Sequence, residues 1–294
     1  MLNRCVIGLD QSTQGTKAIL LDCEGEIVAK TFLPHEQIIS AEGWVSHDGE
    51  EIYRNSIHVI RQLIEDAEIN KSSVAAIGIS NQRETTIAWD RETGKPVEHA
   101  IVWQCARAKE VTDEITDDSF RRSVREKTGI PLSPYFPAAK AAWILRRNEH
   151  AQELARTGKL CIGTVDSWLV YKLTEGALFK TDYSNAARTQ LFNLHTLNWD
   201  EEICETLGAP LIALPQVTFS DGDFGATTLN GFFDAPVPIR AVMGDSHAAL
   251  FGQGCVKPGM AKVTYGTGSS IMMNIGPEFK ESKSGLVTSL AWGR

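Results

Sequence analysis

The segment Gly8–Lys17 carries residue types that can bind phosphate and a divalent metal ion. A tight turn of small residues exposes several backbone N–H groups, to which Thr13 and Thr16 add hydroxyl donors and Lys17 adds a point charge. Asp10, at a strand end, can hold Mg²⁺ through water molecules, because Mg²⁺ gives up its hydration shell reluctantly. The segment joins two predicted strands, whereas a P-loop opens a helix. An ordinary β-hairpin with a polar turn is the alternative interpretation.

A second segment, Thr264–Ser270, repeats this chemistry later in the sequence. Gly266 and Gly268 flank Thr267 and allow the backbone to approach an anion closely, since glycine has no Cβ. On its own this segment is also typical of a plain hairpin. Together the two segments predict a two-sided clamp for phosphate groups.

Asp245 lies where a predicted strand gives way to a predicted helix, in the segment Gly244–His247. An acid at this position can cap the helix N-terminus. It can equally serve as a general base that accepts the proton of an attacking hydroxyl while a phosphoryl group arrives in line. The residue types alone leave both interpretations open.

Four consecutive polar residues, Asn81–Glu84, follow the predicted strand 74–80. Such residues are costly at a strand end unless they are paired or solvated. Arg83 can donate hydrogen bonds to substrate hydroxyls, and Glu84 can accept them. The alternative is a salt-bridged surface loop.

Aromatic and histidine residues are weaker indicators of a binding site. Trp103 can cover the apolar face of a polyol or belong to the core, and Tyr135 can point its hydroxyl into a cleft or pack in a turn. His47, His195 and His247 lack the spacing of metal ligands. We interpret them as structural, with His247 at most near the substrate.

The elements that must position these residues alternate between strands and helices. The predicted strands cover residues 6–10, 17–22, 27–32, 74–80, 85–89, 101–103, 161–164, 241–244, 262–265 and 270–275. The predicted helices cover residues 50–67, 106–116, 120–127, 138–147, 165–173 and 246–251. This alternation predicts the α/β class.

A unit of strand, polar turn and strand occurs at residues 6–22 and again at 262–275. Two such units predict two similar domains that face each other across a cleft. Residues 286–292 form an apolar run that we predict as a further strand, and a hairpin cannot bury its own apolar face. We therefore expect residues 1–250 to form the first domain and residues 251–294 to be the beginning of a truncated second one.

Bulk properties exclude several classes of function. The net charge of -8 makes the chain a poor general partner for nucleic acid. Its six cysteines show no C-x-x-C spacing, which predicts free thiols in a reducing cytoplasm. No apolar run approaches the ~20 residues of a membrane-spanning helix. We expect a cytoplasmic protein that binds neither nucleic acid nor membranes.

In their order and spacing, these segments resemble the FGGY carbohydrate kinases and, within that family, the glycerol kinases. The similarity runs from Gly8 to Leu286 and is most specific in Gly43–Val45, Asn81–Thr86, Ile101–Cys105, Asp182–Ala186, Leu191–Thr196, Gly244–Asp245 and Tyr265–Gly268. The resemblance implies two actin-like, ribonuclease H-like domains, each a mixed sheet flanked by helices. It also implies that ATP and substrate bind in the cleft between them.

The resemblance further implies a role for each matched position. Asp10 would organise Mg²⁺, and Asp245 would be the catalytic base. The phosphates of ATP would be bound by Thr13, Gln14, Gly15, Lys17, Gly266, Thr267 and Gly268. The polyol would be bound by Arg83, Glu84, Trp103, Tyr135, Asp245 and Ser246.

The implied reaction is ATP-dependent phosphorylation of a small polyol or sugar, with glycerol as the first candidate. The chain departs from glycerol kinases at Ser246, where they have glutamine, at Ser270, where they have phenylalanine, and at Lys17, where they have arginine. The two serines favour a wider, wetter pocket, so a kinase for xylulose or erythritol is the alternative. A non-catalytic actin-like ATP-binding protein is the alternative of another class, and a homo-oligomer is left open.

Overall fold

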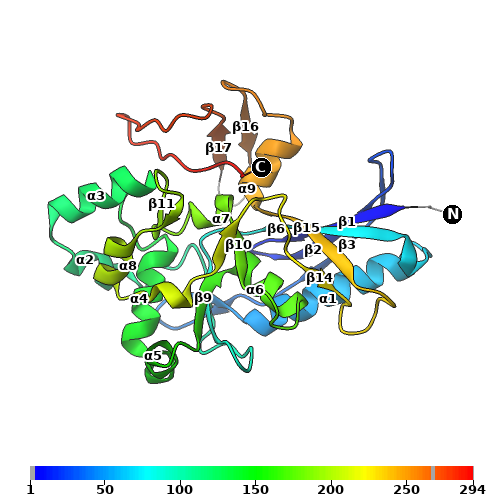
Figure 1. The fold of residues 1–294 in the computed structure, drawn as a ribbon, viewed down its shortest axis with the longest axis horizontal. Helices are drawn as coiled ribbons and strands as arrows, with labels where there is room; N and C mark the ends of the chain where they lie inside the picture. Colours follow the sequence, from blue (N-terminus) through cyan, green and yellow to red (C-terminus); the bar gives the residue numbers. More distant parts are fainter. Residues whose placement is uncertain (1–3, 266–268, 294) are drawn as a thin grey trace.

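The structure is a computed structural model that describes residues 4–265 and 269–293 (Figure 1). Its largest sheet has the strand order β14-β15-β6-β1-β2-β3. The strands are β1 (Cys5–Gln11), β2 (Gly15–Leu21), β3 (Ile27–Pro34), β6 (Val74–Asn81), β14 (Ala226–Thr227) and β15 (Val237–Gly244). β1, β2 and β3 form an antiparallel meander, and β6 and β15 extend it in parallel with β1.

The parallel strands end at the same level. Gln11, the last residue of β1, lies opposite Asn81 of β6, and Asn81 lies opposite Gly244 of β15. The carboxyl ends of parallel strands therefore meet at one edge of the sheet, which is where open α/β sheets bind ligands.

One face of this sheet is covered by α1 (Gly49–Asp66) and α6 (Val165–Leu173). Alternate strand residues such as Ile7, Leu9 and Ile77 point into this core and are almost completely buried. Their neighbours Gly8, Asp10 and Gly78 line a pocket on the opposite face. The alternation follows from the period of two in a strand.

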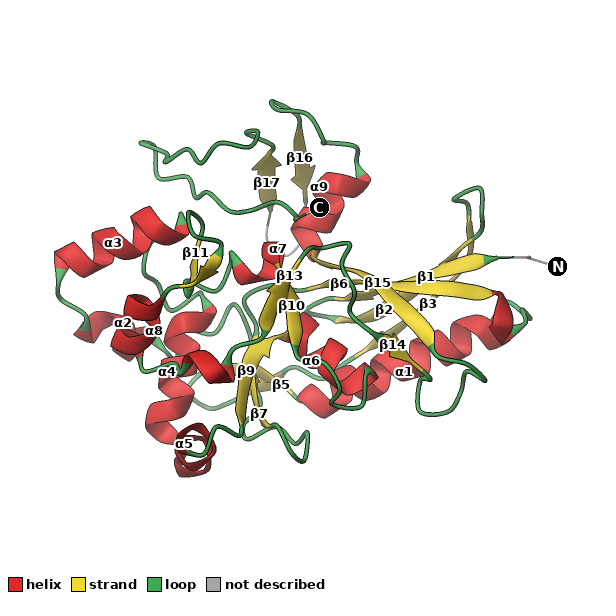
Figure 2. Cartoon of the chain, in the orientation of Figure 1, coloured by secondary structure: helices red, strands yellow, loops and turns green. Residues whose placement is uncertain are grey.

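A second sheet, with the order β4-β5-β8-β7-β9, contributes residues to the first core and to a second core that it shares with several helices (Figure 2). Its strands are β4 (Ile38–Ile39), β5 (Val45–His47), β7 (Thr86–Asp90), β8 (Ala100–Ile101) and β9 (Leu160–Thr164). The nearby helices are α2 (Lys109–Glu114), α3 (Asp118–Thr128), α4 (Pro137–Arg147), α5 (Glu149–Arg156) and α8 (Glu201–Leu207).

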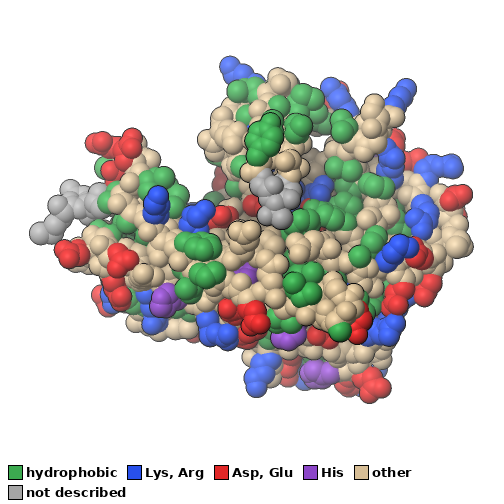
Figure 3. Space-filling view, turned by 180° about the vertical axis from the view of Figure 1, so that it is seen from behind, with side chains coloured by type: hydrophobic (Ala, Val, Ile, Leu, Met, Phe, Trp, Pro, Cys, Tyr) green, Lys and Arg blue, Asp and Glu red, His purple; other side chains and the backbone are tan. Residues whose placement is uncertain are grey.

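Shorter elements connect and complete these two layers. They are β10 (Lys180–Asp182), α7 (Tyr183–Ala186), β11 (Phe192–Asn193), β12 (Asn198–Trp199), β13 (Gln216–Thr218), α9 (Asp245–Gly252), β16 (Ala261–Thr264), β17 (Ser270–Met273) and 3₁₀ turns at Lys71–Ser73 and Leu211–Ala213. β16 and β17 form a hairpin that pairs with neither larger sheet. Acidic and basic side chains are interspersed over the face drawn in Figure 3.

The predicted α/β class and mixed sheet are confirmed, but the strand predicted at residues 286–292 is wrong. Within the described residues this segment pairs with no strand and is held by side-chain packing and a backbone hydrogen bond. Trp292 lies edge-on to Phe251 at 5.3 Å between ring centroids, and the Thr288 amide donates to the Gly129 carbonyl. The cysteines are free, as predicted, and Cys23 alone among them is exposed. Among the described residues, none of the helices is both long and apolar enough to cross a bilayer.

Asp166 on α6 is a fully buried acid whose oxygens accept hydrogen bonds from the hydroxyls of Thr164 and Thr181 at 2.5 and 2.6 Å. Burial, reinforced by the nearby Asp182, raises the pKa of Asp166 to about 7. Its pKa in the unfolded chain is the ordinary value of 3.8. The protonated group therefore stabilises the fold fully below about pH 4, and this contribution is lost as the pH rises through about 7.

We expect Asp166→Asn to be more stable than the wild type at about pH 8 but not at about pH 5, because the amide stays neutral throughout. The difference should be on the order of a few kcal/mol. Urea denaturation at both pH values measures it. Equal destabilisation of the variant at both pH values would contradict the assignment.

Candidate active site

A cleft of about 560 Å³ opens where the three parallel strands end. It brings together eight of the residues predicted to bind phosphate or polyol: Thr13, Gln14, Arg83, Glu84, Trp103, Tyr135, Asp245 and Ser246. These residues come from the β1–β2 turn, the segment after β6, the segment after β8, the approach to α4 and the start of α9. Their convergence follows from the strand register and not from proximity in the sequence.

Asp245 begins α9 directly after β15, and the helix N-cap is Gly244 rather than Asp245. Arg83 Nε donates to Asp245 Oδ1 at 2.9 Å, and the Ser246 amide donates to the same oxygen at 2.6 Å. No residue within 4–265 or 269–293 donates a hydrogen bond to Oδ2. The side chain of Asp245 is 42% exposed and that of Arg83 is 12% exposed. The carboxylate is thus fixed through one oxygen and accessible through the other.

Glu84 is not part of a surface loop, because its side chain is 2% exposed and paired with Arg188. Arg188 Nε lies 2.5 Å from Glu84 Oε1. Burial opposes ionisation of Glu84, but the adjacent Arg83 and Arg188 outweigh it and hold the pKa of the carboxyl below its usual value. Glu84 is therefore a charged acceptor at the wall of the cleft.

Two aromatic rings also line the cleft. The Trp103 and Tyr135 ring centroids are 5.7 Å apart, and Trp103 Nε1 donates to Thr13 Oγ1 at 2.8 Å. Burial, reinforced by Glu84, raises the pKa of Tyr135 to about 12, so its phenol remains a hydrogen-bond donor at neutral pH. The indole bond also joins the predicted polyol wall to the predicted phosphate turn.

The β1–β2 turn is held from three sides. The Ser12 amide donates to the Gly15 carbonyl at 2.9 Å, and Gln82 Nε2 donates to the Ser12 carbonyl at 3.1 Å. His35 Nε2 lies 2.8 Å from the Thr13 carbonyl, and burial lowers the pKa of His35, so a neutral imidazole donates there. The turn is consequently fixed before any ligand arrives.

Gly15 does not line the cleft, although the resemblance placed it in the phosphate loop. It lies buried in β2, where a Cβ would come within 2.5 Å of the Leu33 carbonyl and 2.7 Å of the Phe32 ring. The close packing of β3 therefore accounts for glycine at this position.

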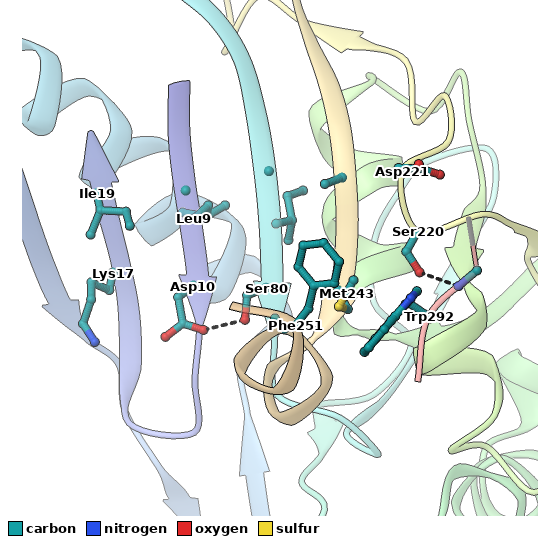
Figure 4. A pocket seen from close by; sticks show the side chains of 16 residues that line it. Leu9, Asp10, Lys17, Ile19, Ser80, Ser220, Asp221, Met243, Phe251 and Trp292 are labelled. Atoms are coloured by element: carbon teal, nitrogen blue, oxygen red, sulfur yellow. Dashed lines mark hydrogen bonds between the residues drawn. The ribbon is translucent and has the colours of Figure 1, made fainter. Parts of the chain in front are cut away.

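Asp10 and Lys17 line a neighbouring pocket of about 560 Å³ on the open face of the large sheet (Figure 4). They are direct partners across β1 and β2, and Ser80 Oγ donates to Asp10 Oδ1 at 2.9 Å. Burial raises the pKa of Asp10 against the effects of Ser80 and Lys17, and the charge of Asp245 raises it further. A divalent cation would relieve both effects, so this carboxylate fits a magnesium site.

The second predicted clamp, Gly266, Thr267 and Gly268, lies outside the described residues. The adjoining Ser269 and Ser270 line the same cleft as the β1–β2 turn. Ser270 and Ser246, two of the three departures from the glycerol kinase pattern, therefore share this cleft.

Sequence reasoning missed three buried residues, Gln82 in the lining of the cleft and Arg188 and Lys140 behind it. Gln82 lay inside the polar run Asn81–Glu84 and could have been selected with its neighbours. Arg188 follows the matched segment Asp182–Ala186 but carries no spacing signal of its own. Lys140 interrupts the apolar face of a predicted helix, which is the one available sign that it is buried.

Comparison with known proteins identifies the family. Residues 5–252 match the N-terminal domain of the FGGY family of carbohydrate kinases. The chain belongs to this family. Glycerol kinase 2 of Thermotoga maritima is 48% identical to this FGGY protein over 288 residues, which are 98% of the chain and 58% of that relative. The glycerol kinase of Citrobacter koseri is 44% identical over 98% of the chain and 57% of its own length.

Solved structures confirm the actin-like fold of this FGGY chain. The crystal structure of Plasmodium falciparum glycerol kinase with ADP matches with a TM-score of 0.93 at 34% identity, over 98% of this chain and 58% of that one. A ligand-bound xylulose kinase from Lactobacillus acidophilus matches with a TM-score of 0.81 at 22% identity, over 91% of this chain and 54% of that one, a likeness of fold alone. The chain thus spans less than two thirds of the length of these proteins.

We expect Arg188→Met to destabilise the fold by about 3 kcal/mol, because it strands the buried Glu84 carboxylate without its closest partner. Chemical denaturation measures the loss. The matched control is Arg156→Met, which breaks the exposed pair with Glu153 and should leave the stability close to that of the wild type. The double change Glu84→Gln with Arg188→Met should recover part of the loss, and equal effects of the two single arginine variants would refute the pairing.

Proposed function

We propose that the full-length protein transfers the γ-phosphoryl group of ATP to a hydroxyl of a small polyol, with glycerol as the first candidate. The observation that carries this proposal is Asp245, fixed by Arg83 through Oδ1 and open at Oδ2, beside the phosphate turn. The family membership and the glycerol kinase relatives support the same reaction class.

In the proposed reaction the substrate oxygen attacks the γ-phosphorus in line, and the bond between that phosphorus and the bridging oxygen of ADP breaks. Asp245 Oδ2 accepts the proton of the attacking hydroxyl. Arg83 keeps the carboxylate oriented because its guanidinium is held between Glu84 and Asp245. Arg83, Glu84 and the Tyr135 phenol offer donors and acceptors to the other hydroxyls, and Trp103 covers the carbon chain.

The triphosphate would bind to the preformed turn at Thr13 and Gln14. Asp10 would hold Mg²⁺, which neutralises charge on the phosphate oxygens during transfer. Lys17 lies beside Asp10 and keeps a cation next to that carboxylate. The proposal also includes a first domain that ends at residue 250 and a cytoplasmic location. It leaves room for a homo-oligomer.

Ser246 and Ser270 in the cleft favour a second candidate, a kinase for a longer substrate such as erythritol or xylulose. Small polar residues there leave more room and more water than large side chains would. A panel of glycerol, erythritol, xylulose and ribulose with the full-length protein separates the candidates by the highest kcat/KM. ATP hydrolysis that no polyol stimulates would instead favour the non-catalytic ATP-binding alternative.

We expect Asp245→Asn in the full-length protein to lower kcat by at least about 100-fold, because the amide cannot accept the proton. ATP binding should change little. The control Asp66→Asn, on the surface at the end of α1, should leave kcat unaltered. Polyol-dependent ADP release that survives Asp245→Asn would rule out this base.

We expect Asp10→Asn to raise the Mg²⁺ concentration needed for half-maximal activity by about tenfold or more, because a neutral amide is a poorer magnesium ligand than a carboxylate. A magnesium titration at saturating ATP and polyol measures this. An unchanged magnesium dependence would place the metal elsewhere.

A further inference from the structure

Lys140 on α4 is a completely buried lysine that lies behind the cleft and does not line it. Its ammonium donates to the backbone carbonyls of Tyr135 at 2.6 Å and Glu84 at 2.9 Å, and reaches that of Trp103 at 3.5 Å. All three carbonyl groups belong to residues that line the cleft. One side chain therefore joins three segments that are far apart in the sequence.

The chemistry of the ammonium suits this arrangement. A lysine ammonium has three N–H donors on one atom and no acceptor, so it can bond three converging carbonyls. Burial lowers the pKa of Lys140 to about 7, against the opposing effect of the Glu84 carboxylate. Burying a lysine side chain costs free energy, and the hydrogen bonds to the three carbonyls offset that cost.

Glu84 shows what these bonds hold in place. Its backbone has φ +62°, a left-handed conformation that is strained for a residue with a side chain. Lys140 binds the carbonyl of this residue, and Arg188 binds its carboxylate. Glu84 is thus fixed at both ends, which sets the direction in which its carboxylate faces the cleft.

We propose that Lys140 is a positioning residue for the polyol: it sets the relative placement of Glu84, Trp103 and Tyr135 without touching substrate. This inference rests on the proposed kinase function. It assigns the effect of Lys140 to polyol binding and not to ATP binding, because the described contacts that hold the β1–β2 turn come from Gln82, His35 and Trp103. Gln82 and Trp103 belong to segments that Lys140 holds, but both reach the turn through their own side chains, and the backbone of Gln82 is fixed separately by the Gln11 carbonyl.

Lys172 on α6 provides a matched control. It is partly buried, pairs with Glu50 at 2.8 Å and lies over the rings of Tyr53 and Trp168, so its loss also removes favourable contacts. None of these partners lines the cleft. A lysine that serves only the fold should behave in the same way as Lys172.

The experiment compares Lys140→Met, Lys140→Arg and Lys172→Met in the full-length protein, with steady-state kinetics in glycerol and ATP and with thermal unfolding. Methionine keeps the length of the side chain but removes every donor, whereas arginine keeps a cation. We expect Lys140→Met to raise the KM for glycerol by about tenfold or more, since small misplacements of binding groups reduce rates steeply. The KM for ATP should change by less than about twofold, and Lys140→Arg should show a smaller rise for glycerol.

The outcomes separate the inference from the proposed function. For Lys172→Met we expect a lower unfolding temperature with both KM values unaltered. The inference would be overturned if Lys140→Met changed both KM values equally, or if neither Lys140→Met nor Lys140→Arg folded. Either result would show that Lys140 is purely structural. A wild-type protein that phosphorylates no polyol would overturn the proposed function itself, and the inference with it.

Discussion

The site depends on one constraint: the parallel strands β1, β6 and β15 are in a register that ends all three at the same edge of the sheet. The Gln82 amide donates to the Gln11 carbonyl at 2.7 Å, which continues the pairing of β1 and β6 one residue beyond the strand. The chain then departs at three adjacent points, into the phosphate turn, the polar run and α9. A shift of one residue in any of these registers would turn alternate side chains to the opposite face.

A buried polar network fixes this edge of the sheet. Asn81 and Asn185 exchange side-chain hydrogen bonds at 2.9 and 3.0 Å, and the Gly244 amide donates to Ser184 Oγ at 2.9 Å. Asp182 accepts from Ser184 Oγ and from the Asn185 amide. These bonds tie the short helix α7 to the ends of both β6 and β15. The network is almost fully satisfied, so it can favour one arrangement over alternatives without a large penalty.

The sequence predicted those parts of the fold that depend on local periodicity, and it missed parts that depend on distant partners. The helix predicted at 50–67 is present as α1. Its apolar residues recur at helical spacing because one face of the helix is buried against the sheet. Residues 286–292 have a strand-like composition, but a strand also requires a free edge to pair with. Asp10 and Lys17 belong to strands, so their alternation turns them to a second pocket. Lys140 acts through three backbone carbonyls, which leave no trace in the sequence.

The charges of the cleft are already paired among themselves. Arg83 lies between Glu84 and Asp245, and Arg188 is engaged with Glu84, so these cations orient carboxylates more than they attract phosphate. Lys17 contributes a charge beside Asp10, but a lysine lacks the planar fork with which arginine fixes a phosphate group. In the proposed reaction, the orientation of a triphosphate would therefore depend heavily on backbone N–H groups. The bonds from His35, Gln82 and Trp103 to the β1–β2 turn give that turn the rigidity which this task requires.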